Sequence, residues 1–202
     1  MTITDVKTNF IVEQALALFL ERSIGEVTVR DIALRAGVGE ATIYRYFSTK
    51  HNLVCAAAAK LEKQIYETWF SQGHAANGFE RLALFYGTYL EIFSSHREFF
   101  KFIGEFDAFM ISEGKTDSSE YASGLELFKA LGSEAYGQGL ADGSISPVRD
   151  WETFYYATTH ALLELCKKLS AAGVVRQDLR IDRETEIETL TEIILHSLKK
   201  RR

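Results

Sequence analysis

One short segment gathers side chains that donate hydrogen bonds to phosphates and to base edges. Arg30 and Arg45 each carry a guanidinium group that can donate to guanine or to phosphate. Tyr44, Tyr46 and Lys50 stand close to Arg45 in the sequence and suit contacts that fix the position of a nucleic-acid backbone. This combination indicates binding chemistry directed at DNA.

Two short helices joined by a tight turn are expected to position these groups. Thr28, with Asp31 three positions later, resembles a capping box at the start of the first helix. Gly37 permits a left-handed turn, and Val38 and Ile43 supply apolar contacts between the two helices. The second helix is expected over about 39–47, with Glu40, Ala41, Thr42, Tyr44, Arg45 and Tyr46 facing outward.

The ends of the second helix carry further candidates. Gly39 provides no side-chain cap, so the backbone N–H groups there remain able to point at a phosphate. Glu40 either accepts from a cytosine amino group or turns to a neighbouring arginine, and Thr42 suits a base or a phosphate. Ser48 is predicted to cap the next helix and to place Lys50 in its first turn, near a phosphate.

Residues 8–55 resemble the DNA-binding domain of the tetracycline-repressor (TetR) family of bacterial transcriptional regulators. The matching positions are Thr28, Arg30, Ile32, Ala33, Ala36, Gly37, Val38, Thr42, Ile43, Tyr44, Tyr46, Phe47 and Lys50. Gly39, Glu40 and His51 depart from the family pattern, and these departures concern the sequence of the operator.

The resemblance implies an all-α protein with a helix-turn-helix DNA-binding domain over residues 1–52. A larger helical domain for effector binding and dimerisation is implied over residues 53–202. The outward face of the second helix and the resemblance together predict these DNA-binding residues: Thr28, Arg30, Gly39, Glu40, Ala41, Thr42, Tyr44, Arg45, Tyr46 and Lys50.

The remainder of the chain has the apolar period of helices. A first helix containing Phe10 and Phe19 is expected to end by Gly25. Later helices are expected over residues 48–70, 79–94, 99–111, 120–138, 151–172 and 183–200. No alternation typical of strands occurs over a useful length.

The last two helices carry apolar stripes that favour self-association, although the same stripes could instead close the core of a single chain. In the TetR family the last two helices form the dimer interface, and a twofold operator requires two recognition helices. The predicted interface residues are Trp151, Tyr155, Leu162, Leu169, Ile187, Leu190, Ile194 and Leu198.

Most of the aromatic residues follow residue 65, which indicates either a cavity for an apolar or aromatic small molecule or a bulky core. His160 would give such a cavity a polar contact or be a satisfied core residue. Glu105 and Asp107 would either pair with a cationic ligand or be solvated. The predicted ligand-binding residues are Tyr86, Tyr89, Phe93, Phe102, Phe106, Phe128, Tyr156 and His160.

Composition fits a cytoplasmic binding protein. The net charge of −5 argues against an indiscriminate nucleic-acid binder, so affinity should come from two local basic heads in one dimer. No apolar run is long enough for a membrane span. Cys55 and Cys166 match neither a disulfide framework nor a zinc spacing, so both are expected to be reduced core residues.

No catalytic motif, metal site or cofactor-binding loop is predicted. The function favoured is a homodimeric transcriptional regulator without enzymatic activity. It is expected to act as a repressor that a small hydrophobic or aromatic ligand releases from an inverted-repeat operator. One alternative is a regulator that activates transcription or needs no effector. A more distant alternative is a helical enzyme or interaction module.

Overall fold

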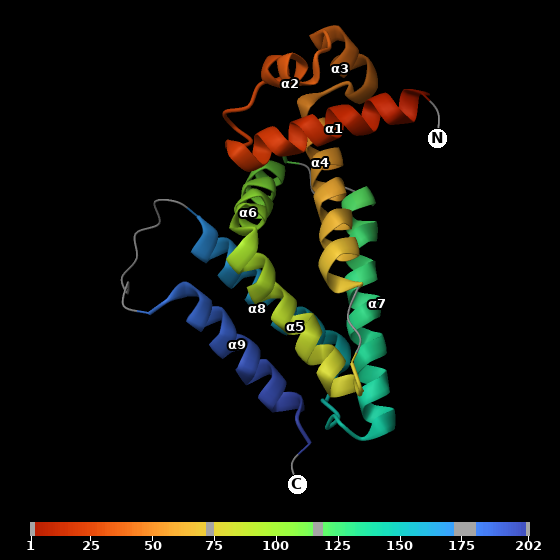
Figure 1. Cartoon of the computed structure of the whole chain (residues 1–202), viewed down its shortest axis with the longest axis vertical. Helices are drawn as coiled ribbons and strands as arrows, with labels where there is room; N and C mark the ends of the chain where they lie inside the picture. Colours follow the sequence, from red (N-terminus) through yellow and green to blue (C-terminus); the bar gives the residue numbers. More distant parts are fainter. Residues whose placement is uncertain (1–2, 72–74, 115–118, 172–180, 201–202) are drawn as a thin grey trace. The chain divides into compact units, whose positions relative to one another are not determined.

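The computed structural model describes residues 3–71, 75–114, 119–171 and 181–200. Within these ranges it contains nine α-helices, one π-helical turn and no strand, which confirms the all-α prediction (Figure 1). The helices are α1 (Ile3–Glu21), α2 (Val29–Ala36), α3 (Glu40–Phe47), α4 (Lys50–Ile65), α5 (Gly78–Ser95), α6 (Arg97–Ser112), α7 (Ser119–Asp142), α8 (Trp151–Ser170) and α9 (Arg183–Leu198). The π-helical turn η1 spans Tyr66–Phe70.

The chain forms two compact units whose limits differ from a domain boundary after residue 52. The first unit comprises Met1–Gln64 and Lys101–Leu125, and the second comprises Ile65–Phe100 and Glu126–Arg202. Long-range contacts explain why the first unit includes most of α6. The ring of Phe102 stacks on that of Phe19, with 6.1 Å between the ring centroids. The Glu105 carboxylate also accepts a hydrogen bond from the Ile24 N–H group, at 2.9 Å.

The core of the first unit is built where α1, α2 and α3 pack together. Ile11 and Phe19 of α1, Ile32 of α2 and Ile43 of α3 are all almost completely buried. Burial of these side chains supplies the main favourable free energy for docking helices that are too short to be stable alone. Ile43, which was predicted to pack between α2 and α3, is buried, and the two helices are in contact.

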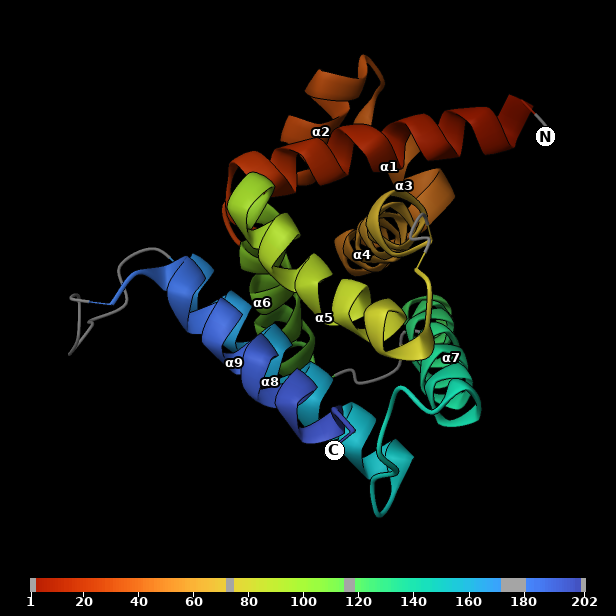
Figure 2. The same cartoon turned by 60° about the horizontal axis from the view of Figure 1, so that its bottom comes forward.

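In the second unit α5 packs against both α8 and α9, and α8 packs against α9 (Figures 1 and 2). Tyr86 and Phe93 of α5 and Leu162 of α8 are fully buried at these contacts. Gly78, at the start of α5, meets the backbone of α7 so closely that a Cβ atom there would lie 2.0 Å from the Gly139 nitrogen. The close crossing therefore depends on glycine.

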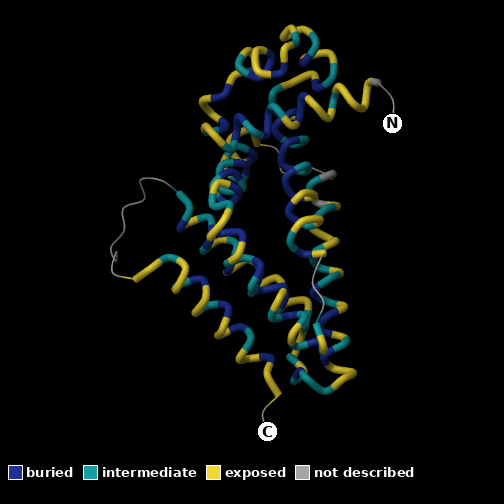
Figure 3. Tube along the Cα trace, in the orientation of Figure 1, coloured by how far each residue is buried: buried dark blue, intermediate teal, exposed yellow. Residues whose placement is uncertain are grey.

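The stripes predicted to form a dimer interface lie mainly inside the chain. Tyr155, Leu162, Leu169, Ile187, Ile194 and Leu198 are buried, and Trp151 and Leu190 are partly buried. For the six buried residues the interface prediction is wrong, because their side chains close the core of the second unit. The opposite faces of α8 and α9 are exposed, as the alternating colours along both helices show (Figure 3).

None of the helices in the described ranges combines the length and the apolar character that a bilayer span requires.

Glu62 is an unusual member of the core of the first unit. Its side chain is 7% exposed, and its Oε1 atom has no hydrogen-bond partner. The carboxyl group lies against α7, where a Cβ atom on Gly124 would come within 2.2 Å of Oε2. Burial raises the pKa of Glu62 to about 8, because an apolar environment penalises the charged form.

This shift predicts that the contribution of Glu62 to stability falls as the pH rises. The folded state holds the proton more tightly than the unfolded state, whose pKa is near 4.5, so the contribution is complete below pH 4.5 and is lost up to about pH 8. Glu62→Gln should therefore be more stable than the wild type above pH 8, by more than about 1 kcal/mol. Urea unfolding between pH 4 and pH 9 measures this, with the exposed Glu192→Gln as control. Parallel profiles for the wild type and Glu62→Gln would contradict the prediction.

Candidate nucleic-acid interface

The first helix of the predicted motif begins at a complete capping box. The Asp31 N–H group donates to Thr28 Oγ1 at 3.1 Å, and the Thr28 N–H group donates to Asp31 Oδ2 at 2.8 Å. Both hydrogen bonds satisfy donors that the start of a helix leaves free. The Thr28 donors also hold the pKa of Asp31 below its usual value, so this carboxylate stays charged at neutral pH.

The turn between α2 and α3 has the predicted left-handed glycine. Gly37 has φ 65° and ψ 31°, and the Val38 N–H group donates to the Ala33 carbonyl at 3.0 Å. Gly39 caps α3 without a side-chain hydrogen bond, as predicted. The turn is tight because only one residue in it must adopt a positive φ.

The α3 helix is anchored on one face and open on the other. Ile43 and Phe47 are buried, whereas the outward positions contain most of the predicted DNA-binding residues of this helix. Glu40, Ala41, Tyr44 and Arg45 are exposed, and Thr42 and Tyr46 are partly buried. The face thus presents polar groups on a rigid helix whose position is set by its buried side.

Arg45 has a defined position on that face. Its guanidinium group lies over the Tyr46 ring, 5.0 Å from the centroid, and donates to the Tyr46 hydroxyl at 3.3 Å. A cation held over an aromatic ring keeps donors available for a phosphate or a guanine. Among the described ion pairs none includes Glu40, so the structure does not show it turned to an arginine.

The cap of α4 differs from the prediction. Ser48 ends α3 at φ 61°, and its N–H group donates to the Tyr44 carbonyl at 2.8 Å. The residue that caps α4 is Thr49, whose Oγ1 atom accepts from the Asn52 N–H group at 3.2 Å. Ser48 is thus not the cap of α4. Only Ser48 and Thr49 separate α3 from α4, and Ser48 adopts the positive φ that ends α3, so the cap falls on Thr49.

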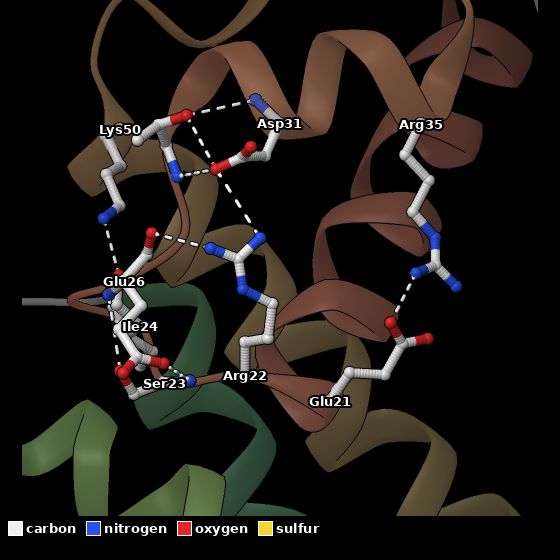
Figure 4. Close-up of polar contacts among 9 residues, drawn as sticks. Glu21, Arg22, Ser23, Ile24, Glu26, Asp31, Arg35 and Lys50 are labelled. Atoms are coloured by element: carbon white, nitrogen blue, oxygen red, sulfur yellow. Dashed lines mark hydrogen bonds and ion pairs between the residues drawn. The ribbon is translucent and has the colours of Figure 1, made fainter.

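Lys50 is in the first turn of α4, as predicted, but its ammonium group has a protein partner. Its Nζ atom donates to the Ile24 carbonyl at 2.6 Å (Figure 4). Burial lowers the pKa of Lys50, while Asp31 and Glu113 act in the opposite direction. The contact explains a cation at a helix N-terminus without a phosphate, although an ammonium group has further donors.

Two arginines outside the predicted set connect α1 with α2. Arg22 lies 3.7 Å from the Asp31 carboxylate and donates to the Glu26 carbonyl, and Arg35 pairs with Glu21 at 2.7 Å (Figure 4). Surface ion pairs of this kind contribute little free energy individually. They connect α2 to the end of α1 and leave Arg30 exposed beside the capping box, where its charge helps to lower the pKa of Asp31.

The residues predicted to bind a ligand do not form one group. Phe102 and Phe106 are buried in the first unit, where Phe106 lies 5.1 Å from the Tyr121 ring. In the second unit Tyr86 and Phe93 are buried and Tyr89 and Phe128 partly buried, and all four lie in its aromatic interior. The Tyr86 hydroxyl shares a hydrogen bond of 2.8 Å with Thr158 Oγ1.

Tyr156 and His160 are exposed, so their assignment to an internal cavity is wrong. They lie one turn apart on the outer face of α8, with ring centroids 5.6 Å apart, and Lys129 lies over the Tyr156 ring. The apolar period of α8 is correct, but both positions fall on the opposite side of the helix. Glu105 is partly buried, and its carboxylate is engaged within the protein, because it accepts from Ile24 and pairs with Lys101 at 3.6 Å.

Sequence reasoning missed the roles of Thr49 and Glu105. Thr49 had a local signal, since threonine is one of the residues preferred at the N-cap of a helix. Glu105 had none, because its partner Ile24 is 81 positions away.

The anchored α3 helix, its glycine turn and its exposed donors form a helix-turn-helix unit of the kind that binds DNA. Residues 11–57 match the model of the bacterial regulatory proteins of the tetR family. Residues 11–57 of the chain are therefore similar to the DNA-binding domain of this family. Among the described residues, no group of three or more histidines, cysteines and carboxylates is placed to hold a metal ion.

Relatives with curated sequences match this domain only. HTH-type transcriptional regulators of Mycobacterium bovis and Mycobacterium tuberculosis are 41% identical to the chain over 51 residues. The match covers 25% of this chain and 24% of the length of those regulators. It therefore supports the N-terminal assignment alone.

Solved structures match almost the whole fold. The fatty acid degradation regulator FadR from Bacillus halodurans has a TM-score of 0.68 at 18% identity, with 94% of each chain covered. A TetR transcription regulator from Haloarcula marismortui has a TM-score of 0.69 at 16% identity, covering 97% of this chain and 100% of that one. FadR from Bacillus subtilis, solved in complex with stearoyl-CoA, has a TM-score of 0.64 at 16% identity, covering 93% and 97%. These similarities show a common fold.

The corrected cap gives a direct prediction about stability. Thr49→Ala should lower the free energy of unfolding by about 1 kcal/mol, because it leaves a donor at the start of α4 without its partner. Ser48→Gly should not destabilise the protein, since glycine tolerates φ 61° better than serine. Urea unfolding of both variants checks this. If Ser48→Gly costs more than Thr49→Ala, the assignment of the cap is wrong.

Proposed function

We propose that the protein is a homodimeric transcriptional regulator that binds double-stranded DNA at an inverted-repeat operator. The observation that supports this is the exposed face of α3, where Tyr44 and Arg45 project from a helix anchored by Ile43 and Phe47. A rigid anchor matters because direct reading of bases requires side chains held in register with the groove.

The size of α3 fits this task. An α-helix with its side chains is about 10–12 Å across, which matches the width of the major groove, and the eight residues of α3 extend about 12 Å along it. Arg45 and Arg30 supply donors for guanine or phosphate, while Tyr44 and Tyr46 suit the phosphate backbone. The backbone N–H groups at the start of α3, beside Gly39, are also suited to bind a phosphate. Lys50 supports the site chiefly through its hydrogen bond to the Ile24 carbonyl. Thr28 caps α2, and Glu40, Ala41 and Thr42 face the bases.

A single helix of this length reads only a few base pairs. Two copies about 34–36 Å apart reach successive major grooves on one side of the duplex. The net charge of the whole chain, −5, disfavours non-specific binding to DNA. Sufficient affinity for an operator therefore requires two basic helix-turn-helix units. The proposed dimer and the inverted repeat therefore depend on each other.

DNA binding is tested by selecting duplexes from a random library at about 150 mM salt, where non-specific binding is weak. The wild type should enrich an inverted repeat. Arg45→Ala should lower affinity for that repeat by about 1–3 kcal/mol, because it removes a donor to guanine or phosphate. Arg35→Ala removes the same charge from a residue paired with Glu21 and serves as the control. Equal loss in the two variants, or no enrichment by a folded dimer, would count against α3 as the recognition helix.

For the dimer interface we propose the outer faces of α8 and α9. On α8 the exposed positions Ala157, Ala161 and Glu164 follow a helical repeat beside Tyr156 and His160. On α9 Ile193 is 61% exposed, which is unusual for a large apolar side chain on a helix whose other face is already packed. Small residues on α8 allow a partner helix to approach closely.

Ile193→Glu should shift the protein from dimer to monomer, because a carboxylate in the centre of a helix pair loses its hydration. Thr189→Glu, one turn away on the same helix, is the milder comparison. Sedimentation equilibrium measures both, with circular dichroism to establish that α9 is folded. A dimer that is unaffected by Ile193→Glu places the interface elsewhere.

We further propose that a small hydrophobic or aromatic molecule enters the aromatic interior of the second unit and releases the operator. FadR from Bacillus subtilis was solved with stearoyl-CoA, which shows that a protein of this fold accommodates a large apolar ligand. In this chain Tyr86, Tyr89, Phe93 and Phe128 would supply the apolar surface for such a ligand, with the Tyr86–Thr158 pair as a polar contact. A molecule that binds better to a state in which the two recognition helices cannot reach both grooves must weaken DNA binding. DNA then weakens the binding of the molecule by the same factor.

Release is tested with a library of apolar and aromatic compounds screened for an increase in melting temperature. A compound that stabilises the protein should lower the affinity for the operator. By linkage, the operator should lower the affinity for the compound by the same factor. Stabilising compounds that leave operator affinity unchanged would contradict release. If no compound stabilises the protein, an effector-independent or activating regulator is favoured.

A further inference from the structure

A histidine, a cysteine and a methionine meet inside the first unit. His51 and Cys55 are one turn apart on α4, and the Cys55 Sγ atom lies 3.5 Å from His51 Nε2. Met110 approaches from α6, with its Sδ atom 3.9 Å from Cys55 Sγ. The three potential ligand atoms thus come from two helices of the same compact unit.

His51 is not explained as a hydrogen-bonded core residue. Its side chain is 8% exposed, and its Nδ1 atom is buried without a partner. The ring is positioned by Phe109, which stacks on it at 5.7 Å and 27°. Among the described contacts, the only polar atom that meets the imidazole is the Cys55 sulfur, so the ring points at the sulfur pair.

We propose that His51 Nε2, Cys55 Sγ and Met110 Sδ form a three-coordinate site for one soft monovalent metal ion, Cu(I). Metal–sulfur and metal–nitrogen bonds of about 2.3 and 2.0 Å, arranged trigonally, separate sulfur from nitrogen by about 3.7 Å and sulfur from sulfur by about 4.0 Å. The observed separations of 3.5 and 3.9 Å are close to these values.

The chemistry of the ligands selects the ion. Thiolate and thioether sulfur prefer Cu(I), and imidazole accepts it as well. Zinc prefers four ligands and binds thioethers poorly, so this trio does not suit it. On binding, the Cys55 thiol releases its proton to solvent and the thiolate lone pair forms the metal–sulfur bond.

Charge balance favours the same ion. One thiolate and one monovalent cation sum to zero, so the occupied site has no net charge to bury. Met110 is 9% exposed, and Leu53 and Val54 of α4, next to Cys55 in the sequence, are fully buried in the same unit. A divalent ion would leave one positive charge in these apolar surroundings.

The experiment titrates the full-length reduced protein with Ag(I), a redox-inert substitute, and with Cu(I) under anaerobic conditions against a competing chelator. The wild type should bind one ion. His51→Gln and Met110→Leu should each weaken binding at least about tenfold, because each removes one ligand at similar volume. Cys55→Ser should abolish stoichiometric binding. Cys166→Ser, which changes the other cysteine, is the matched control and should bind normally.

Wild-type affinity in both His51→Gln and Met110→Leu would overturn the site, since a cysteine acting alone does not need them. Loss of binding in Cys166→Ser would overturn it as well. Thermal unfolding followed by circular dichroism identifies any variant that does not fold. X-ray absorption of the Cu(I) wild type is the second measurement. Two sulfur neighbours and one nitrogen are expected, and a shell without two sulfurs excludes the site.

Discussion

Both backbone polar groups of Ile24 are hydrogen-bonded to charged side chains, and the arrangement of α1 to α4 depends on these two bonds. Its N–H group donates to the Glu105 carboxylate at 2.9 Å, and its carbonyl accepts from the Lys50 ammonium group at 2.6 Å. One peptide segment between α1 and α2 is thereby fastened to α6 and to the start of α4. Charged partners make these hydrogen bonds stronger than neutral ones would be.

This arrangement fixes α3 without touching it. The α3 helix is held between α2, whose start follows Ile24 closely, and α4, whose first residue is Lys50. Arg35 and Arg22 add contacts between α1 and α2 from the other side. The outward face of α3 can therefore present Tyr44 and Arg45 without using them to anchor the helix, so both side chains remain exposed.

The features that could be predicted from the sequence are those determined over a few residues. The capping box at Thr28, the positive φ at Gly37 and the helical period of each segment depend on local backbone chemistry. The role of Lys50 was interpreted too narrowly for the same reason. A cation in the first turn is unfavourable by local rules, and the carbonyl that compensates for it belongs to Ile24, 26 positions away.

Periodicity also could not decide which side of a helix is buried. In α8 the stripe with Leu162 faces the core, and the stripe with Tyr156 and His160 faces outward, yet both contain aromatic or apolar residues. The deciding information is the packing of α5 against α8 and α9, which no single helix encodes. A helix with apolar groups on both sides can meet its own chain on one face and a second chain on the other, which is what a protein needs when its activity requires two copies.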